Sequence, residues 1–227
     1  MSNKGNSRHI KRLAASKYAD IARKEAKYMI KPSPGRHTLS TSISLASLLR
    51  DKLGIASDTN EALSVIKKGS VEVNEKIAKD GKLPVGFGDI IHILPTDQYF
   101  AVSVNRQGAV SVEKASKETK RIAKIVKKFA AKKGKLMVRL HDGTILECPS
   151  GANVNDSAVL KAGKIESIIK LEPGAKCTIY KGKHTGEQGT IKQISKGTAQ
   201  ARATVEIESG TGTVKTLLDN IIVTGGV

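Results

Sequence analysis

The chain has 227 residues, with 39 Lys and Arg against 21 Asp and Glu and a formal net charge of +18 at pH 7. An excess this large repels itself in the compact state, so it predicts a polyanionic partner, either nucleic acid or an anionic membrane. No apolar run approaches the roughly 18 residues of a spanning helix, and the charged start MSNKGNSRHIKR lacks the apolar core of a signal peptide. We therefore expect a cytoplasmic protein that binds nucleic acid and no membrane.

Residues 1–37 are predicted to form a basic arm, which carries ten Lys and Arg against two acidic residues. The run KPSPGRH (31–37) ends any helix there, because two prolines and a glycine lie within four positions. With so little apolar surface the arm cannot fold alone, and we expect it to become ordered on its partner. A tail that stays disordered is the alternative, since blocks of like charge often do.

Residues 38–99 predict the first folded unit, a small α+β domain. Apolar residues at helical spacing predict a helix over TLSTSISLASLLRDKLGI (38–55), ending at Gly54. A second helix is predicted to start at Asp58 or Thr59 and to end at Gly69. VEVNEKIA (71–78) then predicts a hairpin that turns at residues 74–76, and GFGDIIHIL (86–94) predicts the closing strand.

Residues 100–170 predict a central β-rich domain with one basic helix. FAVSVNRQGAVSV (100–112) and KLMVRLHDGTILECP (135–149) each read as a hairpin, the second turning at Asp142-Gly143. Between them, Ile122, Ile125, Val126 and Phe129 have helical spacing, and the other positions are rich in lysine. The sequence therefore predicts a helix between Lys120 and Lys133 with cationic faces.

Residues 171–227 predict a final β-rich module. Short apolar runs at AKCTIY (175–180), GTIKQI (189–194), ARATVEIE (201–208) and VKTLLDNIIVTG (214–225) are separated by turn signals, which is typical of a small barrel. The whole chain is thus predicted to be an α+β protein with an arm, an α+β domain, a β-rich domain and a small β-barrel.

The loop KGKHTGEQGTI (181–191) has the densest glycine punctuation in the chain. It is not a nucleotide-binding P-loop, because Glu187 rather than Lys follows Gly186 and the next segment reads as a strand rather than a helix. The glycines at 182, 186 and 189, followed by Thr-Ile, instead resemble the KOW motif of ribosomal proteins and transcription-elongation factors. Glycine there would let a sugar-phosphate backbone approach closely. An ordinary hairpin whose glycines serve only the turn is the alternative.

A second resemblance covers residues 47–93. SLLRDKLGIASDTNEALSVIKKGSVEVNEK followed by GDIIHI looks like the S-four RNA-binding domain, although Glu75 stands where that family usually has a turn glycine. The order of parts is more specific: RHIKRLAA, PSPGRH, the S-four segment, LHDGTI, VNDS, the KOW loop and TLLDNIIVTG resemble the archaeal and eukaryotic family of small-subunit ribosomal protein four, the "four-e" type. We expect the archaeal type, since eukaryotic members continue with a further basic tail.

Together, the charge pattern and these resemblances imply a structural constituent of the small ribosomal subunit that binds and clamps ribosomal RNA beside neighbouring ribosomal proteins. A free transcription-elongation or RNA-processing factor is the alternative. The candidate RNA-binding residues are Lys4, Arg8, His9, Lys11, Arg12, Arg36 and His37 in the arm, Arg50, Lys52, Lys67, Lys68 and Lys76 in the S-four segment, Lys120, Arg121, Lys124, Lys127, Lys128, Lys132 and Lys133 in the predicted helix, and Lys181, Gly182, Lys183, His184 and Gly186 in the KOW loop.

No enzyme is expected. The five histidines fall in different segments, without the spacing of a metalloprotease or of a nucleophile–base pair. The two cysteines are far apart and show no metal-ligand spacing, which fits a reducing compartment. We therefore predict no metal, no cofactor and no small-molecule substrate.

Overall fold

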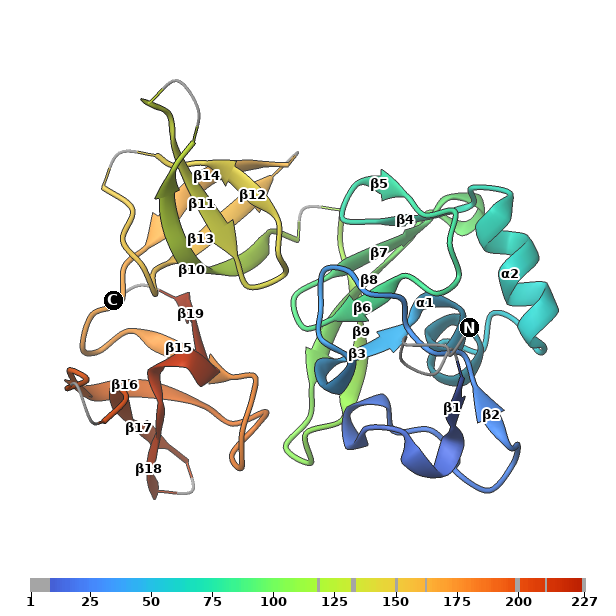
Figure 1. The fold of residues 1–227 in the computed structure, drawn as a ribbon, viewed down its shortest axis with the longest axis horizontal. Helices are drawn as coiled ribbons and strands as arrows, with labels where there is room; N and C mark the ends of the chain where they lie inside the picture. The colour runs from blue at the N-terminus through green and yellow to red at the C-terminus, as the bar shows by residue number, and fades with distance from the viewer. Residues whose placement is uncertain are drawn as a thin grey trace, which may run out of the picture.

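The computed structural model describes residues 9–117, 119–131, 134–149, 151–161, 163–198, 201–210 and 212–225. Four predicted RNA-binding residues, Lys4, Arg8, Lys132 and Lys133, lie outside these ranges. The described chain consists mostly of β-strands with few helices. Figure 1 shows α1, α2 and β1–β9 on one side and β10–β19 on the other.

The N-terminal arm packs on the first half of the molecule. β1 (Ile10–Lys11) pairs antiparallel with β2 (Tyr28–Met29), and two short 3-10 turns, η1 (Arg12–Ala14) and η2 (Lys17–Ala19), lie between them. Tyr18, Ala19 and Ile21 are buried in the same core as the following domain. We expected the arm to become ordered on its partner, but residues 9–37 pack on the chain's own following domain, because these apolar side chains reach a core formed by later residues.

The helical part of the first half begins later than expected. Residues before Leu45 form a 3-10 turn, η3 (Leu39–Thr41), and a strand, β3 (Ser42–Ser44), which pairs with β6 (Pro84–Gly86). The helix then comprises one α-turn, α1 (Leu45–Ser47), and a π-turn, η4 (Leu48–Lys52). The second helix, α2 (Thr59–Lys67), agrees with the prediction, and Asp58 caps it by accepting from the Asn60 N–H.

The main sheet of this half has the order β5-β4-β7-β8-β9. Its strands are β4 (Val71–Val73), β5 (Lys76–Ile77), β7 (Ile90–Ile93), β8 (Gln98–Val104) and β9 (Val110–Ala115), with η5 (Leu94–Thr96) before β8. The limit expected after residue 99 falls inside β8. The hairpin assigned to the central domain thus extends the first sheet, because residues 98–101 of β8 pair with the whole of β7.

The second sheet has the order β12-β11-β10-β13-β14. It contains β10 (Arg121–Ala130), β11 (Leu136–Leu140), β12 (Ile145–Glu147), β13 (Ser157–Lys161) and β14 (Lys164–Ile169). The hairpin predicted at Asp142-Gly143 is confirmed, with Gly143 at φ +82° and the Thr144 N–H bonded to Asp142 Oδ1 at 3.0 Å.

The basic helix predicted between Lys120 and Lys133 is wrong: β10 occupies residues 121–130. Its first half pairs with β13 and its second half with β11, and an irregularity between Ile125 and Lys127 leaves Val126 exposed. Ala123 and Ile125 form the buried face at strand spacing. Isoleucine and valine favour strands, and two available partner strands outweigh a helical spacing that four apolar residues satisfied by chance.

The third sheet, β18-β17-β16-β15-β19, forms the C-terminal part. It comprises β15 (Lys176–Ile179), β16 (Gln188–Ser195), β17 (Thr204–Ser209), β18 (Gly212–Leu217) and β19 (Ile221–Gly225), with η7 (Leu218–Asn220) before β19. Its core includes Ile179, Ile191 and Ile207. The second and third sheets are joined where β19 packs on β10, β13 and β14, and the Val223 N–H donates to Ser157 Oγ at 3.0 Å.

Candidate nucleic-acid interface

Several of the predicted RNA-binding cations form ion pairs within the first half. Arg12 is buried, and its guanidinium lies 3.0 Å from Glu25 Oε2 and 3.7 Å from Asp51 Oδ2. Lys52 Nζ lies 2.6 Å from Asp20 Oδ2. The Arg12–Asp51 and Lys52–Asp20 pairs fasten the arm to the turn that follows α1, whereas the Arg12–Glu25 pair lies within the arm.

Arg50 joins the two helical segments. Its Nε donates to Asp51 at 2.7 Å, and Nη1 donates to Thr59 Oγ1 at 2.6 Å at the start of α2. The hydrogen bond to Asp51 is the main reason that the pKa of Arg50 is raised. Three of the Arg50 nitrogens are therefore already bonded to Asp51 and Thr59 within the chain.

Three exposed lysines gather at one corner of the first sheet, where the end of α2 meets β5. Lys67 and Lys68 end the helix and Lys76 begins β5. A methyl group on Gly69 would lie 3.3 Å from Ile77 Cγ2, so the two segments are in contact. Of the five predicted RNA-binding residues in the S-four segment, these three are the ones that are exposed.

The turn beside this corner forms without the glycine of the S-four family. Asn74 and Glu75 both have positive φ, +53° and +63°. The Asn74 side chain accepts from the Ile90 N–H at 2.9 Å and donates to Asp89 Oδ1 at 2.7 Å. Asparagine tolerates the left-handed region better than most residues, and these bonds hold the turn in place.

A buried charged network joins the two halves of the molecule. Asp89, which follows β6, accepts from His37 Nε2 at 2.9 Å and lies 3.6 Å from Arg121 Nη2. Arg121, at the start of β10, also pairs with Asp142. Burial alone would raise the pKa of Asp89, but the opposing charges of His37 and Arg121 and the hydrogen bonds from His37 and Asn74 hold that pKa well below its usual range.

Two further buried groups lie next to this network. Burial lowers the pKa of His141 to about 4, so its imidazole is neutral near pH 7; Nε2 donates to the Phe87 carbonyl at 3.1 Å. Burial likewise lowers the pKa of Lys124 to about 8, and Lys124 Nζ donates to the Leu218 carbonyl at 2.5 Å. Arg121 and Lys124, predicted to face RNA, thus connect β10 to other parts of the chain.

The remaining cations of β10 and its flank are more open. Lys127 and Lys128 are exposed, and Lys128 Nζ donates to the Ala152 carbonyl at 3.1 Å. Lys120 lies 3.1 Å from Glu166 Oε2 at the surface. His9, in the arm, is exposed beside Tyr28, with ring centroids 5.8 Å apart.

The loop between β15 and β16 carries the predicted KOW residues. Lys183 is exposed and Gly182 has φ +100°, whereas His184 Nδ1 lies 3.3 Å from Glu187 Oε1. Gly186, at φ +86°, sits against the hairpin of the first sheet: a methyl group there would lie 2.2 Å from the Asn105 carbonyl oxygen. A backbone therefore approaches this glycine closely, and it is the chain's own, while the approach of a sugar-phosphate backbone stays a prediction.

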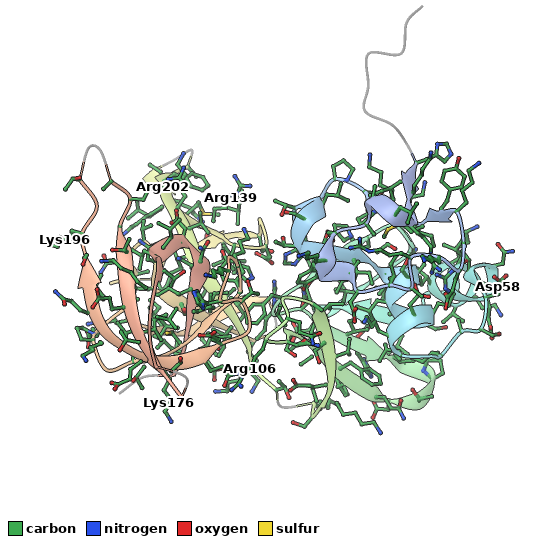
Figure 2. All side chains as sticks on the ribbon, turned by 90° about the horizontal axis from the view of Figure 1, so that it is seen from below. Asp58, Arg106, Arg139, Lys176, Lys196 and Arg202 are labelled. Carbon is green, nitrogen blue, oxygen red and sulfur yellow. The ribbon has the colours of Figure 1, made fainter. Side chains whose placement is uncertain are left out.

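Three residues that line one cavity, Arg139, Tyr18 and Tyr180, were not among the RNA-binding residues predicted from the sequence. Arg139 is exposed on β11 between buried Val138 and Leu140, and Figure 2 shows it on the side of its half that faces the N-terminal half. The alternation of VRL was the signal that could have found it. Tyr180 is buried, stacks on Phe87 at 5.9 Å and donates to the Asp219 carbonyl at 3.1 Å.

The described ranges contain no group of three or more His, Cys, Asp or Glu side chains that could hold a metal ion. Nor does any helix within them have the length and apolar character needed to cross a membrane.

The fold and its charges define a class first: a strongly basic, mostly β protein with lysines exposed on each of its three large sheets, as is typical of proteins that bind a polyanion. Two family models match the chain, the RS4NT domain over residues 4–40 and ribosomal family S4e over residues 96–165.

Relatives cover nearly the whole chain. The small ribosomal subunit protein eS4 of Methanocella arvoryzae is 32% identical over 96% of this chain and 94% of its own, and that of Nanoarchaeum equitans is 33% identical over 95% and 94%. The crystal structure of 30S ribosomal protein S4e from Thermoplasma acidophilum superposes with a TM-score of 0.69 at 29% identity, covering 82% of this chain and 96% of that one. This chain belongs to the eS4 family of small ribosomal subunit proteins.

Proposed function

We propose that this protein is a structural constituent of the small ribosomal subunit in the cytoplasm, where it binds ribosomal RNA beside neighbouring ribosomal proteins. The observation that carries the proposal is the match to relatives named small ribosomal subunit protein eS4 over 96% of the chain. A net charge of +18 supports it, because a chain so rich in cations gains stability from a polyanion.

The mechanism is neutralisation of phosphates by cations held at separate places on a folded body. The exposed cations that we assign to this role are Lys11, Lys67, Lys68, Lys76, Lys127 and Lys183. They belong to the arm, to an S-four-like module whose sheet continues through β9, to the central sheet and to a KOW-containing barrel (171–227). Phosphate contacts supply affinity, and their fixed separations select RNA of the right shape. Binding at several places on one chain also raises the effective concentration of each.

No catalytic role is part of this proposal. The buried His37, Asp89, Arg121 and Asp142 are bonded to one another and serve to hold the two halves together. A rigid body with matched cationic surfaces is what an RNA-clamping protein requires.

Sedimentation of the native protein from a cell extract tests the proposal. We expect co-migration with small subunits after a moderate salt wash that removes loosely bound factors. A pool that stays at the top of the gradient, with none in the subunit fractions, would contradict it and favour a free transcription-elongation or RNA-processing factor. Titration of the full chain against folded small-subunit RNA and an unrelated structured RNA adds a second check, since equal affinity for both would oppose a specific ribosomal role.

A further inference from the structure

A small cavity of about 150 Å³ lies where five separate segments of the chain meet. Tyr18 comes from the arm, Arg36 from the segment before β3, Phe87 from the loop after β6, Arg139 from β11, and Tyr180 and Lys181 from the loop after β15. The cavity is smaller than the roughly 300–1,000 Å³ of ordinary small-molecule pockets. Its occupant is therefore a small group rather than a whole nucleoside.

Two of the residues that line this cavity have a buried polar atom without a hydrogen-bond partner within the described residues: Tyr18 Oη and Arg36 Nη1. Both are donors, because a guanidinium has no acceptor and burial raises the pKa of Tyr18, which keeps its hydroxyl protonated. Leaving a buried donor unsatisfied is costly, so such atoms are rare in folded proteins. Two of them on residues that line one cavity indicate a missing acceptor.

The charges around the cavity are of one sign. Arg36, Arg139 and Lys181 contribute three cations, and its described lining contains no Asp or Glu. The nearby Asp89 is not available to balance them, because it is bonded to His37 and paired with Arg121. A ligand in this cavity is therefore expected to be an anion.

We propose that this cavity binds one phosphate group, with Arg36, Arg139 and Lys181 as its charged donors and Tyr18 as a hydroxyl donor. Arginine suits this task because its planar group donates two parallel hydrogen bonds to phosphate. The inference rests on the proposed function for the source of the group, which is a backbone phosphate of ribosomal RNA. Since the donors come from both halves of the molecule, the bound phosphate also fixes how the two halves are placed relative to each other.

The first arm of the test uses the full chain and inorganic phosphate alone. Thermal unfolding is followed at increasing phosphate concentration, with chloride added to keep the ionic strength constant. We expect a saturable rise in Tm for the wild type and a smaller rise for Arg36→Gln and Arg139→Gln. Lys196→Gln is the matched control, because Lys196 is exposed at the outer edge of the C-terminal half, away from Arg139, and its response should equal that of the wild type (Figure 2).

The second arm titrates the same proteins with folded small-subunit RNA. Loss of a charge-assisted hydrogen bond should weaken the binding of Arg36→Gln and of Arg139→Gln by roughly tenfold or more. The slope of log K against log salt should become shallower by about 0.7–0.9 for each. Lys196→Gln should lose much less affinity. If Arg36→Gln does not fold, the result for Arg139→Gln tests the phosphate site by itself, because Arg139 is exposed and its replacement leaves the core intact.

The two arms separate the outcomes. Equal responses of all variants to phosphate and to RNA overturn the cavity as a phosphate site while leaving the proposed function intact. A response to phosphate alone, with unchanged RNA affinity, overturns RNA as the source and assigns free phosphate. If the wild type does not prefer small-subunit RNA, the proposed function fails, and the phosphate arm still reports on the cavity by itself.

Discussion

Gly186→Ala should destabilise the full chain by separating the β15–β16 loop from the β8–β9 hairpin. The added methyl group would lie 2.2 Å from the Asn105 carbonyl oxygen and 2.6 Å from the Arg106 nitrogen. Both of these atoms belong to backbone, so neither can move aside as the end of a side chain would. Gly151 offers a matched control, because it has the same φ of +86° and nothing within 4 Å of the same methyl position.

The difference between the two variants isolates the steric effect. Each alanine must adopt a left-handed backbone, at a cost of roughly 1–2 kcal/mol. At position 186 the loop must also retreat by about 1 Å, and overpacking of this kind costs about 1–3 kcal/mol. We therefore expect Gly186→Ala to lose about 2–5 kcal/mol of unfolding free energy and Gly151→Ala to lose about 1–2 kcal/mol.

Urea unfolding of both variants and the wild type, under one set of conditions, measures this difference. Equal losses in Gly186→Ala and Gly151→Ala would refute the reasoning, since they would mean that the loop and the hairpin are not in contact in solution. RNA affinity measured where both variants stay folded then shows whether the docked loop matters for binding as well as for stability.

Three other predictions follow from buried and exposed cations. Burial lowers the pKa of Lys124 from 10.5 to about 8, so the folded chain binds fewer protons than the unfolded chain between these values. Stability should therefore rise with pH across that window by up to roughly 3 kcal/mol, and Lys124→Met should lack this rise in urea unfolding at about pH 7 and about pH 10. Arg121→Met should lower the unfolding free energy by about 3–5 kcal/mol, because it leaves buried carboxylates without their cation. Lys120→Met, which breaks the adjacent exposed ion pair, should lower it by at most about 1 kcal/mol. Similar losses for the two variants in thermal or urea unfolding would contradict this prediction. Lys127→Gln and Lys183→Gln should each make the salt dependence of RNA binding shallower by about 0.7–0.9 in slope without changing the unfolding free energy, and an unchanged slope would mean that these lysines are only solvated surface.

Local signals in the sequence predicted several elements correctly. Asp58 caps α2, and Gly69 follows it at φ +77°, as the cap and stop residues indicated. The Asp142-Gly143 turn and its two strands formed where the dipeptide placed them. These features depend on backbone preferences and hydrogen bonds within a few residues, so no distant part of the chain is needed to predict them.

The prediction of a helix over residues 120–133 was wrong, and the reason is that a local pattern could not show the strands that pair with this segment. Ile122, Ile125, Val126 and Phe129 satisfy a helical spacing, yet residues 121–130 form the strand β10, which lies between β11 and β13. A short apolar run of β-branched residues is compatible with either structure, and pairing partners decide between them. Those partners follow later in the chain, beyond the reach of any local pattern.

The sequence by itself determined the charge, the order of the parts and the resemblance to the eS4 family, because composition and motifs are properties of the linear chain. Only the tertiary structure decided which cations face outward. Arg12, Arg121 and Lys124 were expected to bind RNA, but each is directed to a partner inside the protein, while Arg139 is exposed and lines a cavity. The physical reason is that an arginine or lysine side chain looks the same in the sequence whether it ends up paired inside the protein or exposed at its surface. Whether it meets a carboxylate, a carbonyl or solvent depends on segments that folding brings together from up to 94 residues away.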